Sequence, residues 1–113
     1  MRMEKPMIED KLMKLVNGFE EGRSDDWTGL WEIAADVRHD CEVSDNHEVK
    51  DHSLKVVRML MERGFRAGQF KRYGDSKLIL WPDQTPDAVV ARIDKEWDPA
   101  KGDPNINDIC WFE

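Results

Sequence analysis

Hydrophobic positions in the first part of the chain recur at helical spacing. Between Lys5 and Glu21 the apolar residues follow an i, i+4, i+7, i+8, i+11 order, which predicts an amphipathic helix. They are Ile8, Leu12, Leu15, Val16 and Phe19. A second helix is expected to begin near Trp27, after N-cap candidates at residues 24–26. Its inner face would hold Trp27, Leu30, Trp31, Ala34 and Val37.

A third helix is expected to begin near Asp45, before a long stretch of helical periodicity. Asp45 and Glu48 have the three-residue spacing of a capping box, with Asp in place of Ser or Thr. Gly64 has the position of a C′ glycine, which ends many helices. The buried stripe of this helix would contain Val49, Ser53, Val56, Val57 and Leu60.

The remaining elements are short strands around a fourth helix. Residues 65–70 and 77–81 are predicted to form a hairpin around a turn at residues 73–76, and residues 109–112 a final strand. The fourth helix starts clearly, because Thr85 suits the N-cap and Pro86 the first helical position. This order predicts a single α+β domain over residues 1–113. Three helices followed by a hairpin is also the order of a winged helix, so an elaborated winged helix is one form that this fold could take.

Charge is strongly segregated along the 113 residues, although the net charge is only −7. Residues 20–51 contain eleven acidic and three basic residues, a net of −8. The carboxylates around the expected loop between the second and third helices are Asp36, Asp40, Glu42, Asp45, Glu48 and Asp51. Such a surface attracts a basic partner and accelerates association. The simpler interpretation is a solvated face that maintains solubility.

The next segment has the opposite charge. Residues 52–77 contain seven basic and two acidic residues, a net of +5. In a winged helix this region would contact DNA, through Lys55, Arg58, Arg66, Lys71 and Arg72. However, a net charge of −7 repels phosphate, and phosphate neutralisation dominates DNA affinity. Pairing of the basic helix with the acidic segment inside the molecule is the alternative.

Five tryptophans are many for a chain of this length. Trp31 and Trp97 complete helical stripes and are expected in the core. Trp27, at a helix start, and Trp81, before a proline, are predicted to be partly exposed. Tryptophan is enriched at the centres of protein interfaces, so these two are candidate anchors for a partner.

Residues with catalytic or metal-binding chemistry are not arranged in a recognisable site. His39, Cys41, His47 and His52 fall within 14 residues, but their spacing does not match a zinc site. No nucleophile motif or glycine-rich phosphate loop occurs. Cys41 and Cys110 are expected to be free thiols, because a disulfide would require export. We therefore expect no enzyme activity, no metal and no cofactor.

The sequence also lacks the marks of export or membrane insertion. No apolar run approaches the ~20 residues that span a bilayer, and the charged N-terminus has no signal-peptide core. A cytoplasmic protein without a membrane partner is expected.

Several stretches resemble, in order, a group of small uncharacterised bacterial proteins. They are EVKDHSLKVVRMLMERGFRAGQF (48–70), the Trp81-Pro82 step, TPDAVVARIDKEWD (85–98) and DPNINDICWFE (103–113). Arg92-Ile93, Glu96-Trp97 and Trp111-Phe112 match the pattern of that group, whereas residues 98–102 depart from its smoother turn. The first 25 residues, with the N-terminal helix, look particular to this chain.

In size and charge the chain resembles immunity proteins of bacterial toxin systems, such as contact-dependent inhibition and polymorphic toxins. This resemblance implies a non-enzymatic protein that binds and neutralises a cognate toxin, often a basic nuclease. The six carboxylates around the expected loop would then make the charged contacts, with Trp27 as an apolar anchor. The alternative is a winged-helix regulator that uses the basic segment on DNA.

Overall fold

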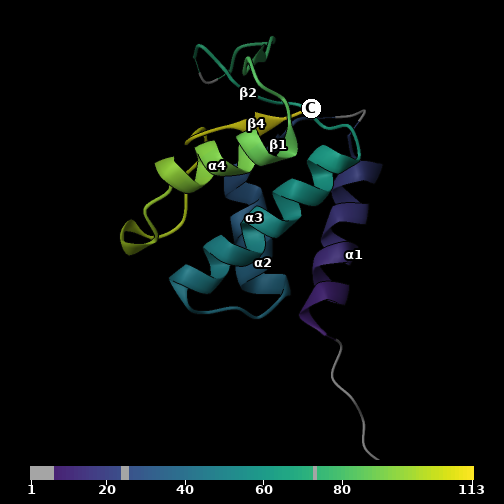
Figure 1. The fold of residues 1–113 in the computed structure, drawn as a ribbon, viewed down its shortest axis with the longest axis vertical. Coiled ribbons are helices and arrows are strands. Elements are labelled where there is room, and N and C mark those ends of the chain that lie inside the picture. Colours follow the sequence, from purple (N-terminus) through teal and green to yellow (C-terminus); the bar gives the residue numbers. More distant parts are fainter. Residues whose placement is uncertain (1–6, 24–25, 73) are drawn as a thin grey trace, which may run out of the picture.

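The chain folds as an α+β protein with four α-helices and a four-stranded antiparallel sheet (Figure 1). This structure, a computed structural model, describes residues 7–23, 26–72 and 74–113. The elements are α1 (Ile8–Glu21), β1 (Thr28–Gly29), α2 (Leu30–Asp40), α3 (Asn46–Glu62), β2 (Ala67–Gln69), β3 (Ile79–Leu80), α4 (Pro86–Glu96), the 3₁₀ helix η1 (Pro99–Lys101) and β4 (Trp111–Phe112). Among the described residues, no helix is long and apolar enough to cross a membrane.

Helix α3 is the centre of the fold, because α1, α2 and α4 all pack against it. The predicted stripe is confirmed, and all five of its residues are fully buried. The Asp45 side chain accepts a hydrogen bond from the Glu48 backbone N–H at 3.2 Å, as expected of an N-cap. Gly64 follows the helix with a φ of 91°, the left-handed conformation that glycine tolerates best.

The sheet joins segments that lie far apart in the sequence, in the order β1-β4-β2-β3. The terminal strand β4 lies inside it, and Trp111 is opposite both Gly29 of β1 and Gly68 of β2. Beyond β4, Arg66 and Glu113 exchange two backbone hydrogen bonds of 2.9 Å. The three predicted strands are present but shorter than expected. β1 was not predicted, and it links the entry of α2 to the chain terminus.

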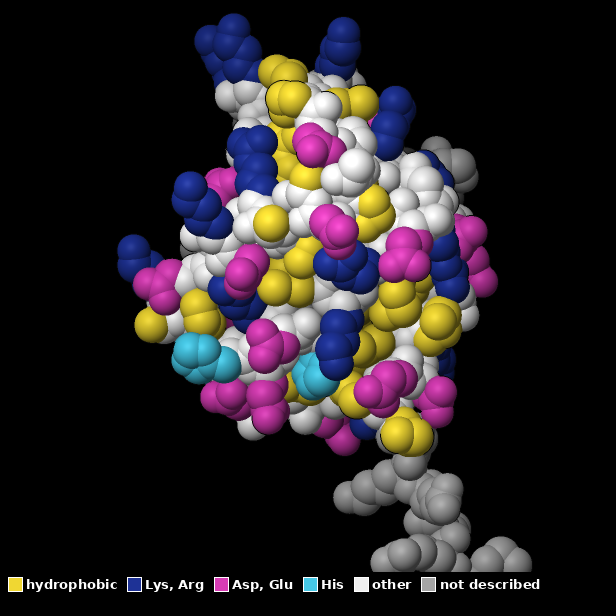
Figure 2. Space-filling view, viewed as in Figure 1, with side chains coloured by type: hydrophobic (Ala, Val, Ile, Leu, Met, Phe, Trp, Pro, Cys, Tyr) yellow, Lys and Arg dark blue, Asp and Glu magenta, His cyan; other side chains and the backbone are white. Residues whose placement is uncertain are grey.

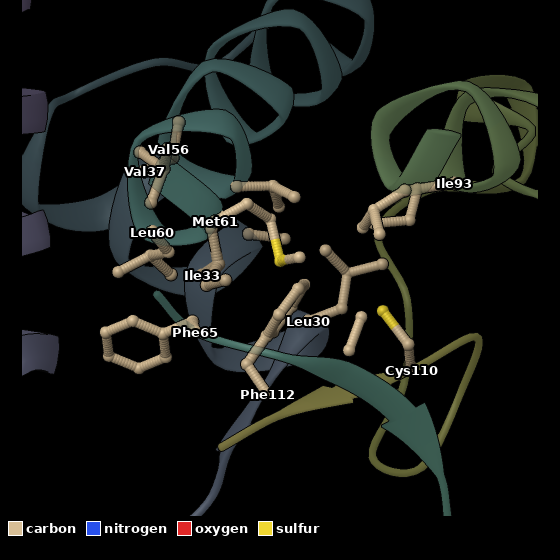
Figure 3. Packing of buried hydrophobic residues seen from close by; sticks show 14 of the residues in the cluster. Leu30, Ile33, Val37, Val56, Leu60, Met61, Phe65, Ile93, Cys110 and Phe112 are labelled. Carbon is tan, nitrogen blue, oxygen red and sulfur yellow. The ribbon is translucent and has the colours of Figure 1, made fainter. Parts of the chain in front are cut away.

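The core fills the space between the helices and the sheet (Figure 3). Leu30 of α2 and Phe112 of β4 lie close together there, beside Met61 at the end of α3. A single cluster of buried side chains extends from Leu12 in α1 to Phe112.

The start of α2 differs from the prediction. The helix begins at Leu30 rather than at Trp27, because Gly29 takes the N-cap position and its N–H donates to Glu32 Oε1 at 3.4 Å. Trp27 therefore precedes β1, and Trp31 is only half-buried. Lys5, the proposed N-cap candidates Ser24 and Asp25, and Tyr73 of the predicted turn lie outside the described residues.

Candidate functional site

Five of the six predicted partner-binding carboxylates lie at one end of the molecule. Asp40 ends α2, Glu42 and Asp45 flank the α2–α3 loop, and Glu48 and Asp51 lie in the first turns of α3. All five are exposed, and we call them the acidic end. Figure 2 shows Asp and Glu side chains gathered at this lower part of the molecule. Lys and Arg side chains gather at the opposite end, which carries β2, β3 and the turn between them and which we call the hairpin end.

Asp36, the sixth carboxylate, belongs to a stripe along α2 that continues from the acidic end. Glu32, Asp36 and Asp40 are four residues apart and therefore occupy one helix face. Asp36 is half-buried. Burial raises its pKa most, and the negative charge of the neighbouring Asp40 raises it further. Burial also raises the pKa of Glu32, against the opposing effect of the Gly29 N–H. Glu32 was not predicted as part of this carboxylate stripe, although its four-residue spacing from Asp36 would have placed both on one helix face.

A groove of about 740 Å³ separates this stripe from α1. Leu15, Phe19 and Cys41 contribute apolar surface, and Lys11 and Lys14 line it opposite Asp36 and Asp40. Cys41 is buried, and burial raises the pKa of its thiol, so the neutral thiol is the stable form. The groove therefore has an apolar floor with both positive and negative side chains at its edges, and the thiol of Cys41 is not an activated nucleophile.

The two predicted tryptophan anchors differ in their surroundings. Trp27 is partly exposed, as predicted, and packs edge-on against Phe70 with ring centroids 5.0 Å apart. It lies beyond the N-terminus of α2, whereas the acidic end begins at the C-terminus, so the structure does not bring them together. The prediction for Trp81 was wrong: only 5% of it is exposed, because the Arg92 guanidinium covers its ring at 4.0 Å.

The basic segment is partly neutralised within the fold. Arg58 pairs with Asp87 of α4, Arg63 with Glu20 of α1, and Arg66 with Glu113. Glu20 belongs to the acidic segment 20–51, as expected of internal pairing, whereas Asp87 and Glu113 do not, and all three partners lie outside the acidic end. Lys55, Lys71, Arg72 and Lys77 are exposed.

Arg38 organises the acidic end, a role that sequence analysis missed. Its Nε and Nη2 donate to the two carboxylate oxygens of Asp103 at 2.7 and 2.8 Å. The same guanidinium donates to the Ser44 carbonyl at 2.8 Å and to Asn46 Oδ1 at 2.6 Å. One side chain therefore ties α2 to the α2–α3 loop and to the segment before β4. No local pattern indicates it, because Arg38 and Asp103 are 65 residues apart.

Within the described residues, no group of three His, Cys, Asp or Glu side chains is placed to hold a metal ion. No protein-family model matches the chain, and searches of the curated proteins and the solved structures found no match either.

Proposed function

We propose that this protein is a non-enzymatic binding protein that captures a basic protein partner through its acidic end. The form that best accounts for its size and charge is an immunity protein that acts in the cytoplasm and neutralises a cognate basic toxin domain. The carboxylates of the acidic end would contact the toxin, with Asp36 at the edge of the contact.

The observation that carries this proposal is the pairing of charges. The three basic residues of segment 20–51 all bind groups other than the acidic end: Arg23 donates to the Gly64 carbonyl, Arg38 to Asp103, and Lys50 pairs with Asp94. Among the described residues, only Glu42 of the acidic end has an ion pair, a 3.8 Å contact with Lys11 in which 83% of the Glu42 side chain is exposed. Exposed pairs of this kind contribute little.

Unpaired carboxylates at one end of a small protein produce a negative potential that extends into solvent. This potential steers a cationic partner and raises the association rate, and salt screens it over about 8 Å at physiological ionic strength. A basic nuclease domain has the complementary charge, because its own substrate is a polyanion. Covering its basic surface would block access of nucleic acid.

DNA binding by the hairpin end is the second candidate. The observation in its favour is that Lys71, Arg72 and Lys77 are exposed around the β2–β3 turn. Against it, α3 is packed against three helices, and Arg58 and Arg66 already have carboxylate partners. A recognition helix needs a free face to enter the major groove.

The proposal is tested by co-expressing the tagged chain with the genes next to its own and purifying it at low and high salt. We expect one stoichiometric basic polypeptide that is released by salt and that inhibits growth when produced alone. Co-purified nucleic acid without such a polypeptide, together with a salt-sensitive gel shift lost on neutralising Lys71 and Arg72, would favour the DNA-binding candidate instead.

A further inference from the structure

A pocket with aromatic walls lies at the other end of α2, away from the acidic end. Its volume is about 340 Å³. Trp27 before β1, Trp31 in the first turn of α2, Phe70 after β2 and Trp111 of β4 line it, and we call it the aromatic pocket. Three regions that are far apart in the sequence therefore contribute the four rings, two of them from Trp27 and Trp31.

The rings are arranged as walls rather than as a stack. Phe70 is edge-on to Trp27, with centroids 5.0 Å apart and planes at 81°, and edge-on to Trp111 at 5.4 Å and 64°. Trp27, Trp31 and Phe70 are half-buried, so part of each side chain remains exposed, whereas only 8% of Trp111 is exposed. A cation that lies over an exposed ring face is attracted by the ring quadrupole.

The backbone around the pocket is built for close approach of these rings. A Cβ atom at Gly29 would lie 2.5 Å from the indole of Trp31 and 3.2 Å from that of Trp111, so only glycine fits. Before β4, Ile109 has a φ of 63°, a left-handed conformation that a β-branched residue rarely adopts. The Asn107 Oδ1 in the same turn accepts a hydrogen bond of 2.8 Å from the indole N–H of Trp111. A strained turn thus fixes one wall of the pocket.

Three carboxylates, from Asp26, Glu32 and Asp75, also line the pocket. Among the described residues, none of the three has an ion pair, and no Lys or Arg lines the pocket. Each accepts a hydrogen bond from a backbone N–H, which positions it: Asp26 from Trp27, Glu32 from Gly29 and Asp75 from Arg72. The negative charge at this site is therefore fixed in place and lacks a cationic partner.

We propose that the aromatic pocket binds a guanidinium group, the side chain of an arginine on a binding partner. A guanidinium stacks on aromatic faces and offers five N–H donors, which matches both the rings and the three carboxylates. A quaternary ammonium would use the rings but has no donors for the carboxylates. A lysine ammonium has three donors but no flat face to stack.

This inference goes beyond the proposed function, since the pocket shares no residue with the acidic end. It holds whether the partner is a toxin or another protein with an exposed arginine. Glu32 nevertheless starts the carboxylate stripe that leads along α2 through Asp36 to Asp40. A basic partner lying along α2 could therefore use both sites together.

The test is a titration of the full chain with N-acetyl-arginine amide, followed through the indole N–H resonances in NMR spectra. N-acetyl-citrulline amide is the neutral control, because it keeps the planar shape and loses the charge. We expect a dissociation constant in about the millimolar range, as for a fragment-sized ligand, with the largest shifts at Trp27, Trp31 and Trp111. Citrulline should bind at least tenfold more weakly.

Two matched variants locate the site. Glu32→Gln keeps the acceptor for the Gly29 N–H but removes the charge, and should weaken arginine binding several-fold. Glu9→Gln makes the same chemical change at an exposed position of α1, outside both the pocket and the acidic end, and should leave the binding unchanged. Folding of both variants is checked by circular dichroism and thermal unfolding.

The proposal is overturned by an absence of saturable shifts, by equal binding of citrulline, or by equal weakening in both variants. Tighter binding of N-acetyl-lysine amide or of tetramethylammonium would also overturn it, because the guanidinium assignment would then be wrong. Since no partner protein is used, these outcomes are separate from success or failure of toxin binding.

Discussion

The acidic end and the region around α4 and β4 use charge in opposite ways. Around α4 and next to β4, three arginines are matched with nearby carboxylates: Arg58 with Asp87, Arg66 with Glu113, and Arg92 with Glu96. At the acidic end the carboxylates stay exposed: Arg38 and Lys50 pair with carboxylates outside it, and among the described residues the 3.8 Å contact between Lys11 and Glu42 is the one ion pair of its five carboxylates. Net charge alone does not reveal this difference, because both regions contribute many carboxylates. The pairing pattern supports the proposal that the acidic end binds a partner.

The largest expected effect on stability concerns the close approach of β2 and β3 at Gly68. Gly68→Ala would place a Cβ atom 2.4 Å from the Ile79 carbonyl oxygen, so β2 and β3 would have to separate. We expect a loss of about 3 kcal/mol in the free energy of unfolding, measured by urea denaturation. The control is Gly18→Ala in α1, where a Cβ meets nothing within 4 Å; it should stabilise the protein by about 0.5–1 kcal/mol. Equal effects at the two positions would contradict the strand packing.

At the opposite end, Arg38→Ala should cost about 2–3 kcal/mol, because it leaves Asp103, the Ser44 carbonyl and Asn46 without their charged donor. Proton exchange of amides in the α2–α3 loop should also accelerate. The control is Glu96→Ala, which breaks the exposed i, i+4 pair with Arg92 and should cost about 0.5 kcal/mol or less. If the two losses were similar, Arg38 would not organise the acidic end.

A smaller effect on stability is expected at Glu42, where two substitutions distinguish the effect of backbone strain from the effect of charge. Glu42 follows α2 with a φ of 56°, and the Val43 N–H donates to the Arg38 carbonyl at 3.1 Å. Gly64 takes the same position after α3, where the Phe65 N–H donates to the Leu60 carbonyl. Glu42→Gly should therefore stabilise the protein by about 1 kcal/mol. Glu42→Gln keeps the Cβ atom and should give no such gain; a gain in both variants would implicate the charge instead.

The smallest effect concerns Asp36, whose pKa is raised from an ordinary value of 3.8 by burial and by Asp40. The folded state then binds more protons than the unfolded state, so stability falls as pH rises through the interval above that value. Asp36→Asn should stabilise the protein slightly at pH 7, and the gain should vanish below the ordinary pKa. Urea denaturation of both proteins at pH 7 and pH 3 measures this. A gain that persists at pH 3 would show that charge is not its source.

The features that sequence analysis predicted correctly are local ones. The caps at Asp45 and Thr85 each depend on residues within one helical turn. Likewise Gly64 alone identifies the end of α3. Helix periodicity located the α3 stripe because one face of that helix is in the core. These signals were enough to predict the α+β class and the order of the main elements.

The features that were missed depend on contacts between distant segments. β1 is only two residues long and exists because β4 pairs with it. Trp81 was predicted to be partly exposed, because the side chain that covers it, Arg92, comes from a different element. The aromatic pocket combines Trp27 and Trp31, which have helical spacing, with Phe70 and Trp111, and no spacing rule connects these last two to the first pair. The sequence identified the exposed carboxylates of the acidic end. It did not show which of them form ion pairs, because the ion pairs of this protein mostly join distant segments.

The most direct test of the central claim is the association rate of the basic partner with two matched triple variants. Asp40→Lys, Glu48→Lys and Asp51→Lys reverse charge at the acidic end, without removing an ion pair or side-chain hydrogen bond found among the described residues. Glu9→Lys, Glu21→Lys and Glu62→Lys change the net charge equally at exposed positions outside it. Stopped-flow measurements over a range of salt concentrations compare both with the unmodified protein. We expect the first variant to slow association by about tenfold or more at low salt and to flatten the salt dependence, whereas the second keeps most of both. Equal slowing in the two variants, or an unchanged rate in the first, would contradict the claim that the acidic end is the binding surface.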